Sequence, residues 1–275
     1  PFESNGKISA ALPEDLMEKG VILADINTAF ERFPEAQKYF FKDTKIDKDK
    51  FVALNAAHFD NGIFLYIPKN VEINEPIRIN FHAEGKNSIL HNIIIVEQNS
   101  KIDFVEEYSN KEIDSEQISC CVTEVFANND SKINFYHLNS WTNNVYNLTN
   151  IVGTLGRNAA INWISGCFGG KLNRLRIDTN FNGQGSNCSN IGIFLGKGKE
   201  HIDFTTNVYH NAENTTNDIL VDGILKDIIS SDQRLINMVS ICMKDSIEWQ
   251  TARLLAKELF KRKKYAKEIL ARTQV

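Results

Sequence analysis

A short strand-like pattern recurs along the middle of this 275-residue chain and constrains its fold more than any other feature. Residues 100–104 read SKIDF, residues 131–135 read SKINF, and residues 160–163, AINW, repeat the pattern a third time. In each copy apolar residues alternate with polar ones, as in a strand with one buried and one solvated face. One such strand cannot bury its apolar face alone. Stacked copies would share a continuous core and pair with the copies above and below.

Around these copies, short runs of Ile, Val, Phe and Tyr alternate with polar residues from Phe51 to about Leu225. This pattern indicates consecutive strands without helices between them. The repetition favours a mainly β fold, a right-handed parallel β-helix, although on repetition alone a sandwich or a barrel stays open. Asn tolerates the positive φ that sharp corners between rungs require. We expect such corners at Asn128, Asn129, Asn143, Asn144, Asn147, Asn150 and Asn158.

Helical patterns flank the strand region on both sides. Residues 26–33 carry apolar side chains at helical spacing, and a second short helix is expected at 35–41. Beyond Asp227, Asp232 is placed to cap one helix, and a second helix with a basic tail follows it. The chain is therefore divided into an N-terminal helical segment (1–50), a β-helix core (51–227) and a C-terminal helical segment (228–275).

Composition places the chain among ordinary soluble proteins, with 42% apolar and 24% charged residues. A net charge of -4 argues against nucleic acid as a partner, and no segment is long and apolar enough to suggest a membrane span. The five cysteines are odd in number and irregularly spaced, which fits reduced thiols better than a disulfide framework. With no secretory pattern at the N-terminus, a cytoplasmic location is expected.

Four stretches resemble the SufB/SufD family of iron–sulfur cluster assembly proteins. They are residues 51–70, residues 91–97 together with 106–108, residues 169–174 and the long late motif at 201–227. Their number, order and spacing extend the resemblance from about Leu12 to Asp227.

The resemblance implies a non-catalytic scaffold that dimerises with itself or with a paralogue. It also implies that an ABC-type ATPase, SufC-like, docks on the C-terminal helices. The sequence has no phosphate-binding loop of the G-x-x-x-x-G-K-[ST] type, so nucleotide chemistry would come from that partner. No tightly bound cofactor is expected, only an iron–sulfur cluster held transiently as part of the complex.

Two other functions are compatible with a β-helix. One is a polysaccharide-active enzyme, for which Asp103, Glu106 and Glu107 are the only dense carboxylates, although such side chains are usually a solvated face. The other is a purely structural, self-associating solenoid.

Two departures from the family pattern matter. Tyr108 stands where SufB-type members carry a cysteine, which favours a SufD-like chain. After Asp227 the family continues in strands, with a motif implicated in cluster assembly, whereas here Ile228 leads almost at once into the terminal helices. Either the chain is a shortened family member or residues are missing between Asp227 and Ile228. We expect the second, and an intact mass equal to 31.2 kDa would contradict it.

Thiolates and imidazoles are natural ligands of iron–sulfur clusters. The candidates in the later strands are Cys167, Cys188, His201 and His210. No C-x-x-C spacing supports a site, and the competing interpretation is buried thiols and hydrogen-bonded imidazoles. Adjacent residues of a strand point to opposite faces, so Cys120 and Cys121 are expected to be structural.

Two further sets of candidate residues follow from the resemblance and from the terminal pattern. The resemblance implies that Arg78, Asn80 and Trp141 line the interior, on a route for sulfur, whereas ordinary packing or pairing is the competing interpretation. On the terminal helix, an aromatic residue beside cations has the composition of an interface anchor, unless the helix folds back onto the β-helix. These partner-binding candidates are Trp249, Arg253, Leu254 and Lys257.

Overall fold

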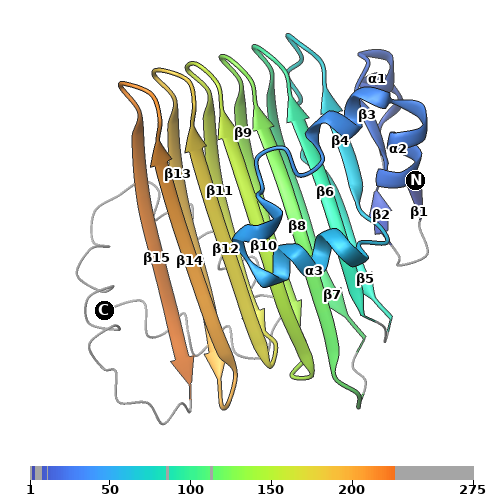
Figure 1. The fold of residues 1–275 in the computed structure, drawn as a ribbon, viewed down its shortest axis with the longest axis vertical. Helices are drawn as coiled ribbons and strands as arrows, with labels where there is room; N and C mark the ends of the chain where they lie inside the picture. The colour runs from blue at the N-terminus through green and yellow to red at the C-terminus, as the bar shows by residue number, and fades with distance from the viewer. Residues whose placement is uncertain (1, 4–7, 11, 85–86, 112–113, 227–275) are drawn as a thin grey trace.

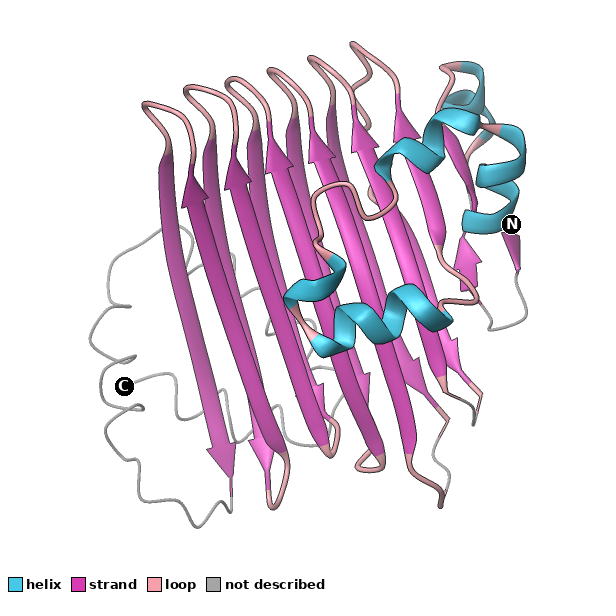
Figure 2. Cartoon of the chain, in the orientation of Figure 1, coloured by secondary structure: helices cyan, strands magenta, loops and turns pink. Residues whose placement is uncertain are grey.

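The computed structural model describes residues 2–3, 8–10, 12–84, 87–111 and 114–226 (Figure 1). The fold is mainly β, with 57% of the described residues in strands, and forms a parallel solenoid of about six turns with a few helices on its N-terminal side (Figure 2). The prediction of a parallel β-helix is confirmed. The predicted C-terminal helices lie outside the described residues. Within the described part, no helix is long and apolar enough to cross a membrane.

Two sheets face each other, and from β4 onward successive strands alternate between them. The first sheet contains β1 (Phe2–Glu3), β2 (Ile8–Ala10), β5 (Ile77–Ala83), β7 (Lys101–Asn110), β9 (Lys132–Trp141), β11 (Ala160–Gly169), β13 (Asn187–Lys197) and β15 (Thr216–Lys226), hydrogen-bonded in that order. The second contains β3 (Ile22–Asp25), β4 (Ile63–Ile67), β6 (Ser88–Val96), β8 (Gln117–Ala127), β10 (Val145–Leu155), β12 (Leu172–Phe181) and β14 (His201–His210), also in that order. Each turn of the chain thus adds one strand to each sheet.

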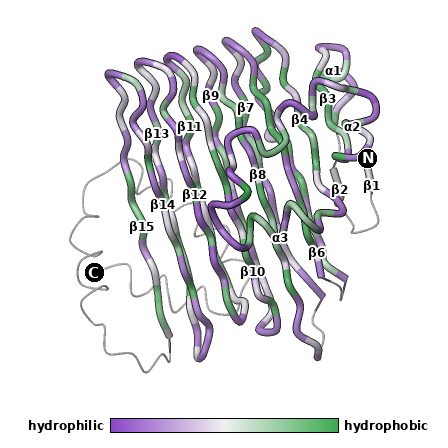
Figure 3. Tube along the Cα trace, in the orientation of Figure 1, coloured by the Kyte–Doolittle hydropathy of each residue, from purple (hydrophilic) through white to green (hydrophobic). Residues whose placement is uncertain are grey.

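The repeat seen in the sequence is the stacking unit of the first sheet. Its three copies lie on β7, β9 and β11, and Phe104 is in register with Phe135, which is in register with Trp163. These three side chains are fully buried between the sheets. Apolar and polar residues alternate along the strands, while the turns are hydrophilic (Figure 3). The period of two therefore predicted which face of these strands is inside.

The N-terminal part contains five short helical elements. They are α1 (Glu14–Glu18), α2 (Ile26–Arg32), the 3-10 helices η1 (Pro34–Tyr39) and η2 (Ile46–Lys48), and α3 (Lys50–His58). Helix α2 confirms the first predicted helix, and η1 replaces the second. The expectation of strands from Phe51 onward is wrong at its start, because Asp49 accepts the backbone N–H of Phe51 and caps α3. The next strand begins only at Ile63.

Five of the seven predicted corner residues lie in turns between strands: Asn128, Asn129, Asn143, Asn144 and Asn158. Asn158 has positive φ, as do Asn70, Asn99 and Asn214, whereas none of the other predicted Asn residues does. Asn147 and Asn150 lie inside strand β10, so their assignment to corners is wrong.

Residues 39–58, here called the strap, run across the outer face of the second sheet (Figure 1). Ion pairs join Lys48 to Asp178 and Asp49 to Arg174, both of which reach strand β12. Asn55 on α3 donates to the backbone oxygen of Leu90 on β6. The strap therefore ties several rungs together from outside.

Candidate functional site inside the solenoid

A buried acid and imidazole lie inside the solenoid, between the two sheets. Glu106 of β7 and His137 of β9 are register partners, and both face inward because they continue the alternation of their strands. His137 Nδ1 lies 2.6 Å from Glu106 Oε1. Both side chains are excluded from solvent, with exposures of 1% and 0%. Burial of such a pair is tolerated only where the remaining polar atoms are also bonded.

Tyr108 satisfies the second oxygen of that carboxylate. Its hydroxyl donates to Glu106 Oε2 over 3.1 Å and accepts from Asn92 Nδ2 over 3.0 Å. The Cys121 Sγ lies 3.3 Å from the same hydroxyl. Since Asn92 and Cys121 belong to the second sheet, these bonds cross the interior from sheet to sheet.

The network continues toward later rungs through carboxamides. Asn139 Nδ2 lies 3.4 Å from His137 Nε2 and 3.7 Å from Cys167 Sγ. Asn139 Oδ1 accepts from Asn173 Nδ2 over 2.8 Å, and Asn173 Oδ1 accepts from Asn147 Nδ2 over 2.9 Å. A hydrogen-bonded path thus runs through the core from β6 to β12.

Burial favours the protonated forms of the phenol and the two thiols of this network. Burial raises the pKa of Tyr108 well above its ordinary value, and nearby Cys121 and Glu106 add to the shift. Burial raises the pKa of Cys167 to about 12. Burial and then the charge of Glu106 raise the pKa of Cys121 as well. Because the thiolate is the nucleophile and the metal ligand, a raised pKa disfavours the reactive form of these two thiols at neutral pH.

The three residues expected to line the interior separate into two groups. Trp141 lies inside, and its ring centroid is 6.3 Å from that of Tyr108. Arg78 and Asn80 are exposed at outward positions of β5, so for these two residues the expectation of interior lining is wrong. The physical reason is the alternation of β5, which buries Ile79 between them.

The four candidate cluster ligands are not brought together. Cys188 is in register with Ile161, six residues before Cys167 on β11, a separation of roughly 20 Å at about 3.3 Å per residue. His201 and His210 are exposed and stand at opposite ends of β14. A single site made of all four is therefore excluded. Among the residues that the structure describes, no group of three or more His, Cys, Asp or Glu side chains could hold a metal ion.

Cys120 and Cys121 face opposite ways, as expected from their adjacency. Cys121 points into the interior network, whereas Cys120 Sγ lies 3.4 Å from the backbone oxygen of Phe51 on α3. Both thiols are buried.

A second buried acid, which the sequence analysis missed, fixes the strap to the sheet. Glu124 of β8 accepts backbone N–H groups from Phe41, Asp43 and Thr44, at 2.7, 3.1 and 3.2 Å. Its Oε2 also lies 3.1 Å from His91 Nε2, and burial lowers the pKa of that imidazole. The local signal is an acid in the middle of a strand whose described residues are all buried apart from Ile118.

The carboxylates of the polysaccharide-active alternative do not converge. Glu106 faces the interior, whereas Asp103 and Glu107 are at outward, partly exposed positions of β7. Two carboxyl groups flanking a shared groove, which sugar hydrolysis requires, are not formed by these three. The partner-binding candidates lie outside the described residues: Trp249, Arg253, Leu254 and Lys257.

Comparison with known proteins identifies relatives of this chain. Residues 79–239 match the family model "SUF system FeS cluster assembly, SufBD core domain", and residues 3–79 match "SufBD protein N-terminal region". The chain is 30% identical over 226 residues to the iron–sulfur cluster assembly protein SufD of Bacillus subtilis (strain 168), covering 80% of this chain and 52% of the relative.

Similar proteins occur in staphylococci. An iron–sulfur cluster assembly SufBD family protein of Staphylococcus aureus (strain USA300) is 28% identical over 220 residues, covering 78% of this chain and 47% of the relative. A family member from Staphylococcus saprophyticus matches to the same extent. The chain thus spans about half the length of the curated relatives it matches.

Proposed function

The chain belongs to the SufBD family of iron–sulfur cluster assembly proteins, and we propose that it is a non-catalytic scaffold subunit of a SUF-type assembly complex. The tyrosine at position 108 and the match to a SufD protein favour a SufD-like role.

The chemical state of the interior is the observation that carries this proposal. Each thiol that the structure describes is buried, and the two inside the network, Cys121 and Cys167, are held protonated by desolvation. Tyr108 and Glu106 occupy the centre with their hydrogen bonds to each other and to neighbours satisfied. Such an interior supports a rigid fold rather than sulfur chemistry.

We propose further that the acting assembly contains two kinds of partner. One is an ABC-type, SufC-like ATPase bound through the terminal segment, and the other is a second β-helix subunit, either identical or paralogous. Support for a multi-protein assembly comes from membership of the SufBD family. The chain itself holds no tightly bound cofactor in this proposal, and a cluster resides on the complex only transiently.

A binding experiment tests the partner assignment. Affinity-tagged chain is mixed with the ATPase, and the dissociation constant is measured for wild type, Trp249→Ala and, as a neighbouring control, Gln250→Ala. We expect Trp249→Ala to weaken binding about tenfold or more, because aromatic anchors carry most of the energy of an interface. Unchanged affinity would reject this docking segment. Self-association without ATPase binding would favour the structural solenoid, and release of unsaturated sugar would favour the polysaccharide-active enzyme.

A further inference from the structure

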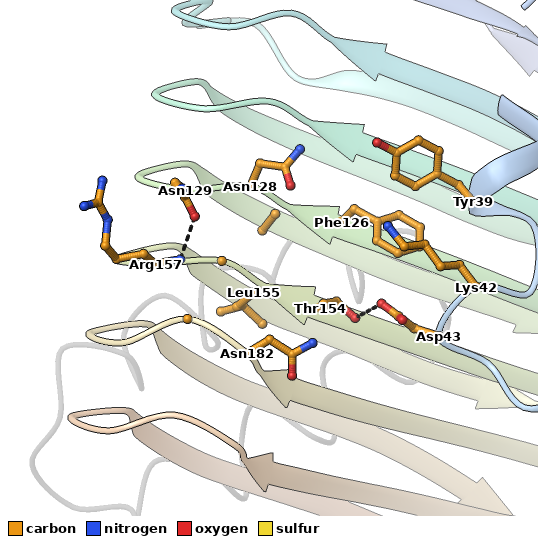
Figure 4. Close-up of a pocket in the computed structure, with 13 residues that line it drawn as sticks. Tyr39, Lys42, Asp43, Phe126, Asn128, Asn129, Thr154, Leu155, Arg157 and Asn182 are labelled. Atoms are coloured by element: carbon orange, nitrogen blue, oxygen red, sulfur yellow. Dashed lines mark hydrogen bonds between the residues drawn. The ribbon is translucent and has the colours of Figure 1, made fainter. Parts of the chain in front are cut away.

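A pocket of about 400 Å³ lies between the strap and three successive turns of the solenoid (Figure 4). The strap contributes Tyr39, Lys42 and Asp43. The solenoid contributes the turns that follow β8, β10 and β12, which stack on one another one rung apart. The pocket is distinct from the interior network and is independent of the function proposed above.

The strap holds Lys42 at this pocket in a constrained conformation. Phe41 has φ of 49°, a left-handed backbone geometry that is unusual for a bulky residue. Glu124 compensates by accepting the N–H groups of Phe41 and Asp43, one on each side of Lys42. Strained backbone is concentrated at functional sites, where the surrounding contacts maintain it. The strained turn at Phe41 therefore points to a function for the adjacent pocket.

Lys42 brings a positive charge to the pocket. Its Nζ lies 4.7 Å from the ring centroid of Tyr39 and 5.3 Å from that of Phe126. It forms no ion pair with any residue in the described ranges. The one carboxylate of the pocket, Asp43, instead accepts the hydroxyl of Thr154 over 2.6 Å, as Figure 4 shows.

The turns contribute mainly hydrogen-bond donors. The Oδ1 of Asn182 already accepts from Asn211 Nδ2 over 3.0 Å, which leaves its NH2 group for the pocket. Likewise, Asn129 Oδ1 accepts the backbone N–H of Arg157 over 2.9 Å (Figure 4). The guanidinium of Arg157 extends away from the pocket and pairs with Asp130 at 3.4 Å.

We propose that this pocket binds a small oxyanion, the phosphate or carboxylate group of a small molecule, on the ammonium of Lys42 and the carboxamide NH2 of Asn182. An ammonium with carboxamide donors matches an oxyanion, since charge-assisted hydrogen bonds are the strong ones. The aromatic rings beneath Lys42 hold the cation without neutralising it.

The test is calorimetric titration of the protein with inorganic phosphate and, separately, with acetate, each against potassium chloride of equal ionic strength. Lys42→Gln removes the charge. The matched control is Lys45→Gln, which removes an exposed lysine of the same strap that does not line the pocket. Chemical unfolding midpoints of both variants verify that they are folded.

We expect one or both anions to bind the wild type and the Lys45→Gln variant equally, and to bind Lys42→Gln about tenfold or more weakly. Binding of phosphate alone assigns a phosphate-bearing ligand, and binding of acetate alone assigns a carboxylate. Failure of both anions to bind, or equal weakening by the two substitutions, would overturn the proposal.

Discussion

Glu106 is the residue on which the polar interior depends. Its two carboxylate oxygens form hydrogen bonds with His137 and Tyr108, so a single side chain satisfies two buried groups on neighbouring strands. The low effective dielectric inside the solenoid strengthens such bonds and makes an unpaired member costly.

Glu106→Ala should therefore be strongly destabilising, because it leaves the imidazole of His137 and the phenol of Tyr108 without their acceptor. We expect the free energy of unfolding, from urea titration, to fall by about 3–5 kcal/mol. Glu107→Ala is the matched control on the outward side of the same strand and should change stability by at most about 0.5 kcal/mol. Equal losses for the two variants would contradict the buried role of Glu106.

The buried thiols predict how stability depends on pH. Burial raises the pKa of Cys167 and Cys188 from 9.0 to about 12. Between those values the unfolded chain releases its thiol protons while the folded chain keeps them. The folded state then binds more protons, so stability falls as pH rises through this window.

The measurement is urea unfolding at pH 8 and pH 10, with Cys167→Ser to remove one of the titrating groups. Wild type should lose more stability over this interval than the variant does, since serine does not titrate there. An equal loss in both proteins would show that Cys167 keeps an ordinary pKa when folded.

Alternation along a strand could have predicted the polar interior, had it been applied to every residue. Ile102 and Phe104 face inward, so Glu106 and Tyr108 must do so as well. The same rule places Arg78 and Asn80 outside. The interior positions predicted for these two residues came from the family resemblance and disagreed with the alternation of their own strand.

At the scale of elements, the strap is fixed by one buried acid. Glu124 accepts three backbone N–H groups of residues 41–44 and contacts His91, so its removal would leave several donors unpaired. The strap is thus attached to the sheet by bonds that depend on this carboxylate.

Glu124→Ala should loosen the strap while the solenoid stays folded. Hydrogen exchange followed by mass spectrometry should show the amides of Phe41, Asp43 and Thr44 exchanging roughly tenfold faster or more, because these three amides lose their acceptor. Glu72→Ala, which removes an exposed ion pair with Lys101, should leave that exchange unchanged. Unaltered exchange in Glu124→Ala would show that other contacts hold the strap.

Helix α3 was missed for a physical reason. Residues 51–59, FVALNAAHF, carry enough apolar side chains to resemble a strand, and the capping residue Asp49 is the only clear helical signal. Its packing against β8 and β6, rather than local propensity, stabilises the helix.

At the scale of the whole molecule, the repeat made the solenoid predictable, because identical alternation on successive rungs forces their apolar faces together. The path of the strap was not predictable. Lys48 and Asp178 are 130 residues apart, and Asp49 and Arg174 are 125 apart. Such contacts leave no local pattern, so the sequence could indicate the core but not the strap that crosses it.

In the proposed scaffold role, this chain does not carry sulfur on its own buried thiols. The most direct measurement incubates the chain and its assembly partners with a persulfide sulfur donor at neutral pH and maps persulfide by mass spectrometry. The burial of the four described thiols predicts no label on Cys120, Cys121, Cys167 or Cys188. Stoichiometric persulfide on Cys121 or Cys167 would contradict the claim.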